Sequence, residues 1–343
     1  MRAASATAVA LLVLGASAAC TDPNAETGRR NPRASDDSGL FAPAPREPDF
    51  PRDAAAVVQT IDSIADSSPS GVAVGSRAVW VTETEADDVI RIDTDTGAIT
   101  ARIPIPVDRT HSGRIERAPT VTSGGVWLCI ERNDVLVRID PAANRIAQSF
   151  RVACRGLSAG PLGFWVGVAP NAIARYDDAT GAVRKRVVVP DDAVLLAQGF
   201  GSLWAYNGEQ HVLHRVDPVS GKLLASVRFG SGGSLVVGER AVYVADGQAD
   251  TITVVDPKTN RVTKVLEVPG NDRLDPVLAV GDGAVWLSTI GGGLARLDER
   301  RLAITSRVQL NRQNRSGEPA VGFGFIWYPT YGNDGVLKVR PLR

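Results

Sequence analysis

The chain is poor in the residues that most often build catalytic and metal centres. Its 343 residues include three histidines, three cysteines and one methionine. It contains no HExxH pair and no Walker loop, so no motif predicts a zinc protease, a nucleotide-binding loop or any other metal site. It also lacks a charge excess, because 38 basic side chains balance 38 acidic ones. No block of basic residues occurs, and nucleic acid is therefore not an expected partner.

What the chain has instead is a repeated pattern. Seven copies run through it, each with an aromatic residue at the same place between small and β-branched residues. These anchors are Trp80, Trp127, Trp165, Trp204, Tyr243, Trp286 and Trp327. They follow one another at intervals of about 40 residues, which is the period of β-propeller blades. We expect the aromatic row to pack between neighbouring blades rather than to stack on a sugar.

Each copy predicts four strands. In the first copy these are Gly71–Val74, Ala78–Glu83, Asp88–Asp93 and Ala98–Ile105, separated by turn-forming residues. An aspartate opens the last turn in six copies: Asp93, Asp140, Asp177, Asp217, Asp256 and Asp298. Its carboxylate can accept turn N–H groups, so these aspartates have a structural role. The sequence therefore predicts an all-β protein, a seven-bladed β-propeller with four-stranded blades.

The seventh copy is incomplete, since the chain ends after its third strand. Residues 55–63 (AAVVQTIDS) resemble the fourth strands of the other copies. We expect this N-terminal strand to pair with the C-terminal hairpin. Such pairing closes the ring and covers edges that would otherwise stay open.

The residues before the propeller predict an export signal and a tether. Residues 1–19 combine an early arginine, a short apolar core and small residues, as in a signal peptide, with Cys20 placed as the lipidated residue of a bacterial lipoprotein. The alternative is ordinary secretion with cleavage near Ala18. Residues 20–53 are rich in Pro, Arg, Asp and Ser and predict a disordered tether. Residues 54–343 then form the propeller.

Ligands of propellers usually sit at the mouth of the central channel. Two sets of loops build that mouth: those joining one blade to the next, and those between the second and third strands of a blade. Their candidate catalytic residues are Glu83, His111, His211 and Asp246. Their candidate ligand-binding residues are Arg109, Arg155, Asn207, Arg315 and Glu318. The competing interpretation for each is a solvated loop side chain.

Two further cysteines lie at strand ends that share one rim of the predicted ring. Cys129 lies near the end of a second strand, and Cys154 begins the inner strand of the next blade. In an oxidising compartment two such cysteines can form a disulfide, although their separation cannot be read from sequence.

The repeat resembles two bacterial propeller families, the YncE-like (YVTN-repeat) proteins and the virginiamycin B lyase-like proteins. The first copy, VWVTE followed by VIRIDTDTG, is similar to the lyase pattern, and TITVVDPKTN in the fifth is similar to the YVTN form. The lyase resemblance implies histidine and glutamate at the channel mouth with magnesium. Glu83 matches the glutamate position, but no histidine follows it within its loop.

These features lead to one expected function and one alternative. We expect a monomeric, extracytoplasmic, membrane-anchored binding scaffold without a cofactor, whose channel mouth engages an envelope protein, a peptide or a small molecule. The alternative is an enzyme, either a lyase of the streptogramin type with magnesium or another hydrolase. For the enzyme, His111 is the better partner of Glu83, because its loop joins the first blade to the second.

Overall fold

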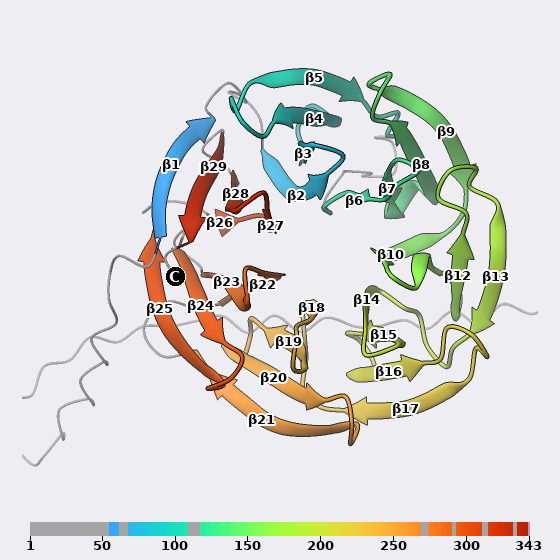
Figure 1. Cartoon of the computed structure of the whole chain (residues 1–343). Helices are drawn as coiled ribbons and strands as arrows, with labels where there is room; N and C mark the ends of the chain where they lie inside the picture. The colour runs from blue at the N-terminus through green and yellow to red at the C-terminus, as the bar shows by residue number, and fades with distance from the viewer. Residues whose placement is uncertain are drawn as a thin grey trace, which may run out of the picture. The chain divides into compact units, whose positions relative to one another are not determined.

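The computed structural model describes residues 55–61, 68–108, 117–268, 274–289, 293–310, 315–331 and 335–341. All of them belong to the compact unit Glu47–Arg343. Their strands form seven antiparallel sheets arranged around a ring, as Figure 1 shows. The predicted seven-bladed β-propeller is confirmed.

The first six blades each run in chain order from an inner strand to an outer one. Blade 1 comprises β2 (Pro69–Gly75), β3 (Ala78–Glu83), β4 (Asp88–Asp93) and β5 (Ile99–Pro104). Blade 2 comprises β6 (Thr120–Val121), β7 (Val126–Ile130), β8 (Val135–Asp140) and β9 (Arg145–Arg151), with the short 3-10 helix η2 (Glu131–Asn133) after β7. Blade 3 comprises β10 (Cys154–Gly160), β11 (Gly163–Val168), β12 (Ala172–Tyr176) and β13 (Val183–Val188).

The second half of the ring repeats this order. Blade 4 comprises β14 (Leu195–Gly199), β15 (Ser202–Asn207), β16 (Val212–Val216) and β17 (Leu223–Arg228). Blade 5 comprises β18 (Ser234–Val237), β19 (Val242–Asp246), β20 (Thr251–Asp256) and β21 (Arg261–Glu267). Blade 6 comprises β22 (Leu274–Gly281), β23 (Ala284–Thr289), β24 (Gly293–Asp298) and β25 (Ala303–Gln309).

Blade 7 joins the two ends of the chain. Its inner strand is split into β26 (Arg315–Ser316) and β27 (Ala320–Gly322), which both pair with β28 (Phe325–Tyr331). β29 (Gly335–Pro341) follows, and β1 (Ala55–Ile61) is the outer strand, antiparallel to β29. Ile61 is buried at this junction. The predicted closure by the N-terminal strand is therefore confirmed, with the strand ending at Ile61 in the described residues.

The aromatic anchors pack between blades, as expected. All six tryptophans are at most 2 % exposed. Most of them also donate their indole N–H to a carbonyl of the preceding turn; Trp165 donates to Leu162 O at 2.9 Å, for example. These five indoles therefore combine a large buried apolar surface with a satisfied polar group, which suits a position covered on both faces, whereas the indole N–H of Trp127 is buried without a hydrogen-bond partner among the described residues.

The turn aspartates also have the predicted role. Asp93 Oδ1, for example, accepts the N–H groups of Asp95 at 3.1 Å and Thr96 at 2.8 Å. Equivalent bonds form at the other five turns. Hydrogen bonds of this kind stabilise the charged form, and folding lowers the pKa of all six carboxyls.

A second repeated contact links neighbouring blades. In several blades a cation on the third strand lies opposite the anchor tryptophan and reaches the last turn of the next blade. Arg91 donates to Asn144 Oδ1 at 3.0 Å, and Arg215 donates to Asn260 Oδ1 at 2.9 Å. Lys338 closes the ring in the same way, since its Nζ donates to Thr94 O of blade 1 at 2.7 Å. We call these contacts the interblade latches.

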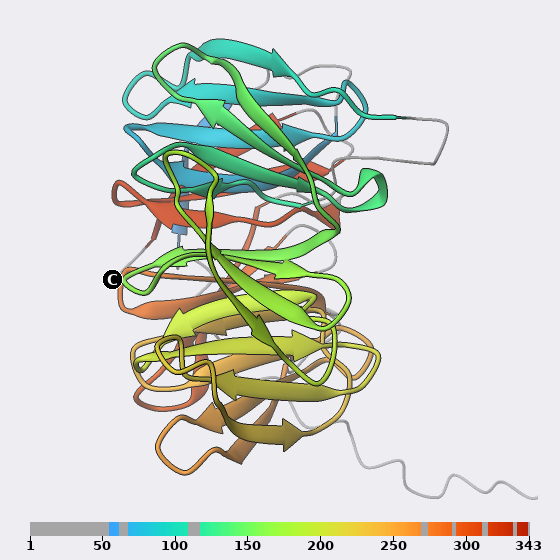
Figure 2. The same ribbon diagram turned by 90° about the vertical axis from the view of Figure 1, so that its right-hand side faces the viewer.

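The chain order places two kinds of connection at each rim. Blade-to-blade connections and the turns between second and third strands lie at one rim, and the remaining turns lie at the other (Figure 2). We call the first rim the channel mouth. Within the described ranges, no helix has the length and apolar character needed to cross a membrane.

Candidate functional site

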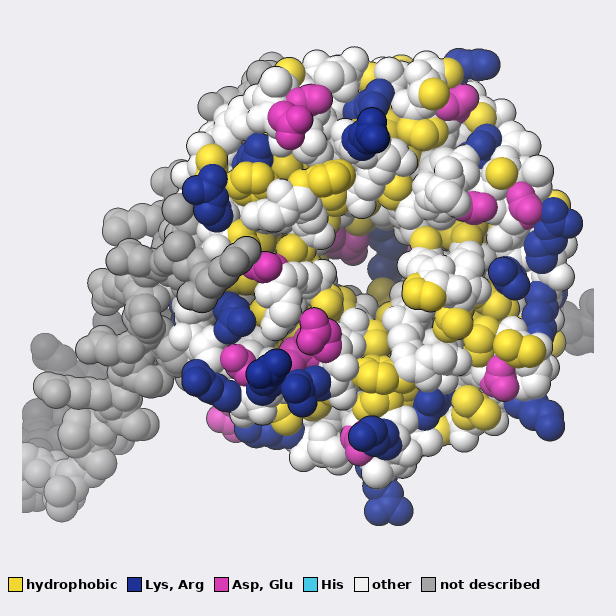
Figure 3. Space-filling model, viewed as in Figure 1, with side chains coloured by type: hydrophobic (Ala, Val, Ile, Leu, Met, Phe, Trp, Pro, Cys, Tyr) yellow, Lys and Arg dark blue, Asp and Glu magenta, His cyan; other side chains and the backbone are white. Residues whose placement is uncertain are grey.

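A cavity of about 240 Å³ opens at the channel mouth, lined by inner strands and by the residues that lead into them. Its two sides differ in chemistry. Arg117, Arg155 and Glu318 supply charge from blades 2, 3 and 7. The opposite side is mainly apolar: besides Gly233 and Ser234 it is lined by Val194, Leu195, Leu196, Leu235, Val277 and Leu278. From the other face of the ring, Figure 3 shows a central opening with charged side chains visible inside it.

The charged side forms where inner strands are short or irregular. β6 has only two residues, so Arg117, Ala118 and Pro119 precede it without joining its ladder. The register of β10 shifts between Cys154 and Leu157, and this stretch carries Arg155. In blade 7, Glu318 lies in the gap between β26 and β27. In these three blades the interrupted stretch carries the charged side chain that lines the cavity, whereas β14 and β18 line it with leucines.

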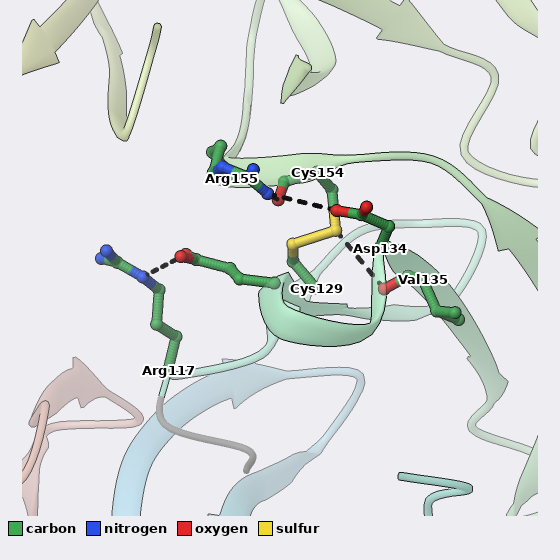
Figure 4. Close-up of a disulfide and its surroundings, with 7 residues drawn as sticks. Arg117, Cys129, Asp134, Val135, Cys154 and Arg155 are labelled. Carbon is green, nitrogen blue, oxygen red and sulfur yellow. Dashed lines mark hydrogen bonds and ion pairs between the residues drawn. A yellow bond between two sulfur atoms is a disulfide. The ribbon is translucent and has the colours of Figure 1, made fainter. Parts of the chain in front are cut away.

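Both arginines are held by acidic residues of the turn after β7, as Figure 4 shows. Arg117 Nε lies 2.6 Å from Glu131 Oε1. Arg155 Nη1 lies 3.5 Å from Asp134 Oδ1 and also donates to Cys154 O at 2.8 Å. Because these contacts use only part of each guanidinium, the remaining N–H groups are available to a ligand. The arrangement holds two guanidinium groups in place and leaves some of their N–H donors for a ligand.

Glu318 is anchored by its backbone and by one carboxylate oxygen. Its N–H donates to Ser70 O at 2.7 Å, and its carbonyl accepts from Val72 N at 2.8 Å. Its Oε2 accepts the N–H of Ala118 at 2.8 Å. Burial raises the pKa of this carboxyl above its usual range; the Ala118 bond and Arg117 oppose the shift, and Glu131 adds to it. Glu318 is thus a carboxyl that takes up a proton more readily than an ordinary glutamate.

A disulfide borders the charged side. Cys129 and Cys154 are joined with an S–S distance of 2.01 Å and a Cα–Cα distance of 5.8 Å. The bond links β7 of blade 2 to β10 of blade 3, and Cys129 lines the cavity. The covalent link therefore joins the strand that leads into Glu131 to the strand that carries Arg155.

Three of the candidate residues named from the sequence accept hydrogen bonds from the backbone of a neighbouring turn. Glu83, Asn207 and Asp246 end the second strands of blades 1, 4 and 5, and each is at most 7 % exposed. Asn207 Oδ1 accepts the N–H groups of Glu209 and Gln210, and Asp246 Oδ1 accepts those of Gln248 and Ala249. Asn207 and Asp246 thus cap the turn that follows, because an Asx oxygen bonds backbone N–H groups two and three residues on.

Glu83 corrects the sequence interpretation most clearly. It was expected in a polar loop, but it is 0 % exposed. Its carboxylate accepts the N–H of Ala86 at 2.5 Å and that of Ser68. A buried carboxylate used in this way supports the turn that follows.

The other candidates do not converge with it. His211 is exposed in the turn after β15. The pKa of the Asp246 carboxyl is lowered: burial, the largest influence, opposes the shift, the hydrogen bonds to the carboxylate lower the pKa, and the nearby His211 adds a smaller lowering effect. Neither residue lines the cavity. Arg109 and His111 lie outside the described residues, as does Cys20, and the side chain of Arg315 is not described. Among the described residues, no histidine lines the cavity.

Sequence reasoning named Arg155 and Glu318 but missed Arg117, Glu131 and Asp134. Arg117 is the last charged residue before an inner strand, and this position indicates a channel-facing side chain only when that strand is known to be short.

The sequence also holds a G-x-S-x-G pattern at residues 156–160. The structure places it inside β10, with Ser158 9 % exposed, so it is not the exposed strand-to-helix turn of a nucleophile elbow.

A second cavity, of about 860 Å³, lies at the opposite rim near blades 1 to 3. Its carboxylates already serve the fold. Asp177 bonds its own turn and Arg184 at 2.8 Å, and Asp178 accepts from Ser123 at 2.8 Å. We therefore place the candidate site at the channel mouth.

Within the described part of the chain, no group of three or more His, Cys, Asp or Glu side chains is arranged to hold a metal ion.

Solved structures with the same architecture include proteins of unrelated roles. A catalytically inactive variant of virginiamycin B lyase from Staphylococcus aureus, with quinupristin, matches at TM-score 0.66 and 19% identity over 83% of this chain and 98% of its own. BamB from Moraxella catarrhalis matches at TM-score 0.56 and 15% identity over 80% and 83%. The WD40 repeats of RRP9 match at TM-score 0.69 and 12% identity over 86% and 100%.

No family model matches the chain, and no curated protein matches its sequence. At these identities the structural likeness shows the propeller fold and nothing finer. Function therefore has to be argued from the site itself.

Proposed function

We propose that this protein is a binding module whose channel mouth holds a ligand with a carboxylate next to an apolar group. The observation that carries the proposal is the division of the 240 Å³ cavity into a charged side and an apolar side. A cavity of this size admits a small molecule or the end of a peptide, and it excludes a folded domain. A peptide end would let the same cavity engage a larger envelope protein.

The charged side favours an anionic ligand that can also accept a hydrogen bond from the Glu318 carboxyl. The free N–H groups of Arg117 and Arg155 can bind a carboxylate, since guanidinium forks match carboxylate geometry. Burial raises the pKa of Glu318, so its carboxyl gains a proton, and with it the ability to donate to a ligand oxygen, at a higher pH than an ordinary glutamate does. The leucines opposite then bury the apolar part of the ligand, which supplies most of the hydrophobic free energy of binding.

We further propose that the module works outside the cytoplasm, held to the membrane through a lipid on Cys20. The signal-like residues 1–19 and the tether-like residues 20–53 support this location, and the disulfide between Cys129 and Cys154 fits an oxidising compartment. Secretion without a lipid is the alternative that the same residues leave open.

The binding proposal is tested by calorimetric titration with N-acetyl-leucine and, as the matched neutral probe, N-acetyl-leucinamide. The acid should bind more tightly than the amide. Arg155→Ala should weaken binding of the acid by about 10- to 100-fold, because a charge-assisted hydrogen bond contributes about 1.5–3 kcal/mol. Arg132→Ala, in η2 but away from the cavity lining, is the control and should leave binding unchanged. Equal affinity for acid and amide would contradict the proposal.

An enzyme is the second candidate, favoured by one observation. Glu318 combines a raised pKa with a place in a cavity beside Arg117, as expected of a general acid. The lyase likeness suggests quinupristin as the probe. A binding module leaves quinupristin intact with and without magnesium, whereas turnover that is lost in Glu318→Gln would support the enzyme.

A further inference from the structure

Outside the cavity lining, three side chains of blades 3 and 4 form a hydrogen-bonded row toward the outer edge of the ring. Ser226 Oγ lies 2.8 Å from His214 Nδ1. His214 Nε2 lies 3.0 Å from Asp191 Oδ2. Ser226 is on the outer strand β17, His214 on its neighbour β16, and Asp191 in the connection from β13 to β14. A serine, a histidine and an aspartate in this order have the pattern of a nucleophile, a general base and a residue that orients the base.

The repeat itself does not require this row. His214 directly precedes the third-strand arginine of its blade. The corresponding residues in the other blades are Ile90, Val137, Ala174, Thr253, Ala295 and Leu337. The position thus tolerates small and apolar residues, and blade packing has no need of an imidazole. His214 is 4 % exposed, so its polar atoms depend on the two partners that the row provides.

The contacts orient the imidazole correctly for a base. The Asp191 carboxylate accepts the proton on Nε2, which leaves the Nδ1 lone pair directed at the hydroxyl of Ser226. Asp191 is itself held near this position by the short connection between two strands. Ser226 is exposed, so an external reagent can reach its hydroxyl while the base behind it stays dry.

The outer edge of the blade offers hydrogen-bond donors next to Ser226. β17 is the last strand of its sheet, and Phe229 N donates to His211 O at 3.2 Å. Hydrogen-bonded and non-bonded pairs alternate along antiparallel strands, so the pairs Val212↔Arg228 and His214↔Ser226 are of the non-bonded kind. The N–H groups of Ser226 and Arg228 therefore point to the open edge, where they can stabilise an oxyanion.

We propose that Ser226 is the nucleophile of an acyl-transfer site on the outer edge of blade 4, acting on esters with an apolar acyl group. Leu224, 49 % exposed and two residues before Ser226 on the same strand, supplies the apolar contact. An extended substrate can also pair with the free edge of β17. The site shares no residue with the cavity lining and does not depend on the binding function proposed there.

The reaction proceeds in two balanced steps. Ser226 Oγ bonds to the ester carbonyl carbon as its proton moves to His214 Nδ1; the C–O bond to the alcohol then breaks, and the alcohol leaves with that proton. Water next attacks the acyl-serine and gives its proton to His214. The acyl–Oγ bond breaks, Ser226 regains the proton, and a carboxylic acid is released.

The test is labelling of the purified full chain with a fluorophosphonate, followed by mapping of the adduct by mass spectrometry. The Oγ–P bond forms, fluoride leaves, and the serine proton passes to His214. Ser149 is a matched internal control: it occupies the same exposed place on β9, opposite Val137 instead of a histidine. We expect an adduct on Ser226 and none on Ser149, and a burst with p-nitrophenyl acetate that disappears in Ser226→Ala.

Two variants separate a catalytic row from a structural one. Asp191→Asn should reduce the labelling rate by roughly 10²-fold or more through loss of the oriented base, while the thermal midpoint stays close to that of the parent. His214→Gln should abolish labelling, with folding checked by circular dichroism. If Ser226 reacts no faster than Ser149, or if Asp191→Asn leaves its labelling rate unchanged, the row is a structural network and the proposal is wrong.

Discussion

Lys338 gives the sharpest test of how the ring is held closed. This third-strand residue of blade 7 is 6 % exposed, lies opposite Gln59 of β1 and Trp327 of β28, and donates to Thr94 O in blade 1. Its ammonium group also lies 4.4 Å from the ring centroid of Phe325 and 5.3 Å from that of Trp327. One side chain therefore connects the first blade, the last blade and the closing strand.

The substitution Lys338→Met removes the charge while keeping the length of the side chain. Losing a charged hydrogen bond costs about 1.5–3 kcal/mol, and losing the cation–π contacts costs about 0.5–2 kcal/mol. Relief of the buried charge offsets part of this, so we expect a net loss of about 2–3 kcal/mol. At about 2 °C per kcal/mol for a chain of this size, the thermal midpoint should fall by about 4–6 °C.

Differential scanning calorimetry and denaturant titration of the same variant measure this loss. Lys258→Met is the control, because Lys258 is exposed in the last turn of blade 5 and should change stability by less than about 0.5 kcal/mol. If the two variants are equally stable, the interblade latch contributes nothing to closure and the reasoning is refuted.

Four further predictions follow from the same structure. A chain that begins at residue 55 should fold as a monomer, whereas one that begins at residue 65 lacks β1 and should aggregate, as light scattering would show; equal behaviour would refute the closure. Replacing Cys129 and Cys154 by serine should cost about 2–4 kcal/mol in denaturant unfolding, with no further effect of reductant. Folding lowers the pKa of the six turn aspartates, so their contribution is complete above the unfolded pKa of about 3.9 and is lost as pH falls through the folded values. Stability measured from pH 7 down to pH 2 should thus drop steeply only below about pH 4. Finally, Cys20→Ala should move the protein from the membrane fraction to the soluble one; a wild-type protein that is already soluble would favour secretion.

The fold could be predicted from the sequence because each blade repeats the same local solution. A buried aromatic residue recurs in all seven copies, and a third-strand cation and a turn aspartate recur in six each, so local propensity and packing agree in most copies. The closing strand was predictable for the same reason: residues 55–61 carry the alternation of an outer strand. The interblade latches were not predicted, because the partner of Lys338 is a backbone carbonyl of Thr94, which no side-chain pattern reveals.

The site was predicted only in part, and the physical reason is that capping and binding use the same atoms. The carboxylate oxygens of Glu83 and Asp246 could bind a ligand, but they can equally accept the N–H groups of the turn that follows. In the structure both side chains are buried and bond to that turn. Arg117 and Glu318 become site residues because inner strands are short or broken in blades 2 and 7. Irregularity of this kind depends on contacts between blades, which a single repeat does not encode.

The measurement that most directly tests the binding proposal is a methyl-resolved NMR titration of the protein with N-acetyl-leucine. The account predicts shifts for the methyl groups of Leu195, Leu235 and Leu278 at the channel mouth, and none for the exposed Leu223 and Leu224 on β17. These shifts should be absent in Arg155→Ala at the same ligand concentration. Shifts confined to β17, or identical shifts with N-acetyl-leucinamide, would contradict a carboxylate-binding channel mouth.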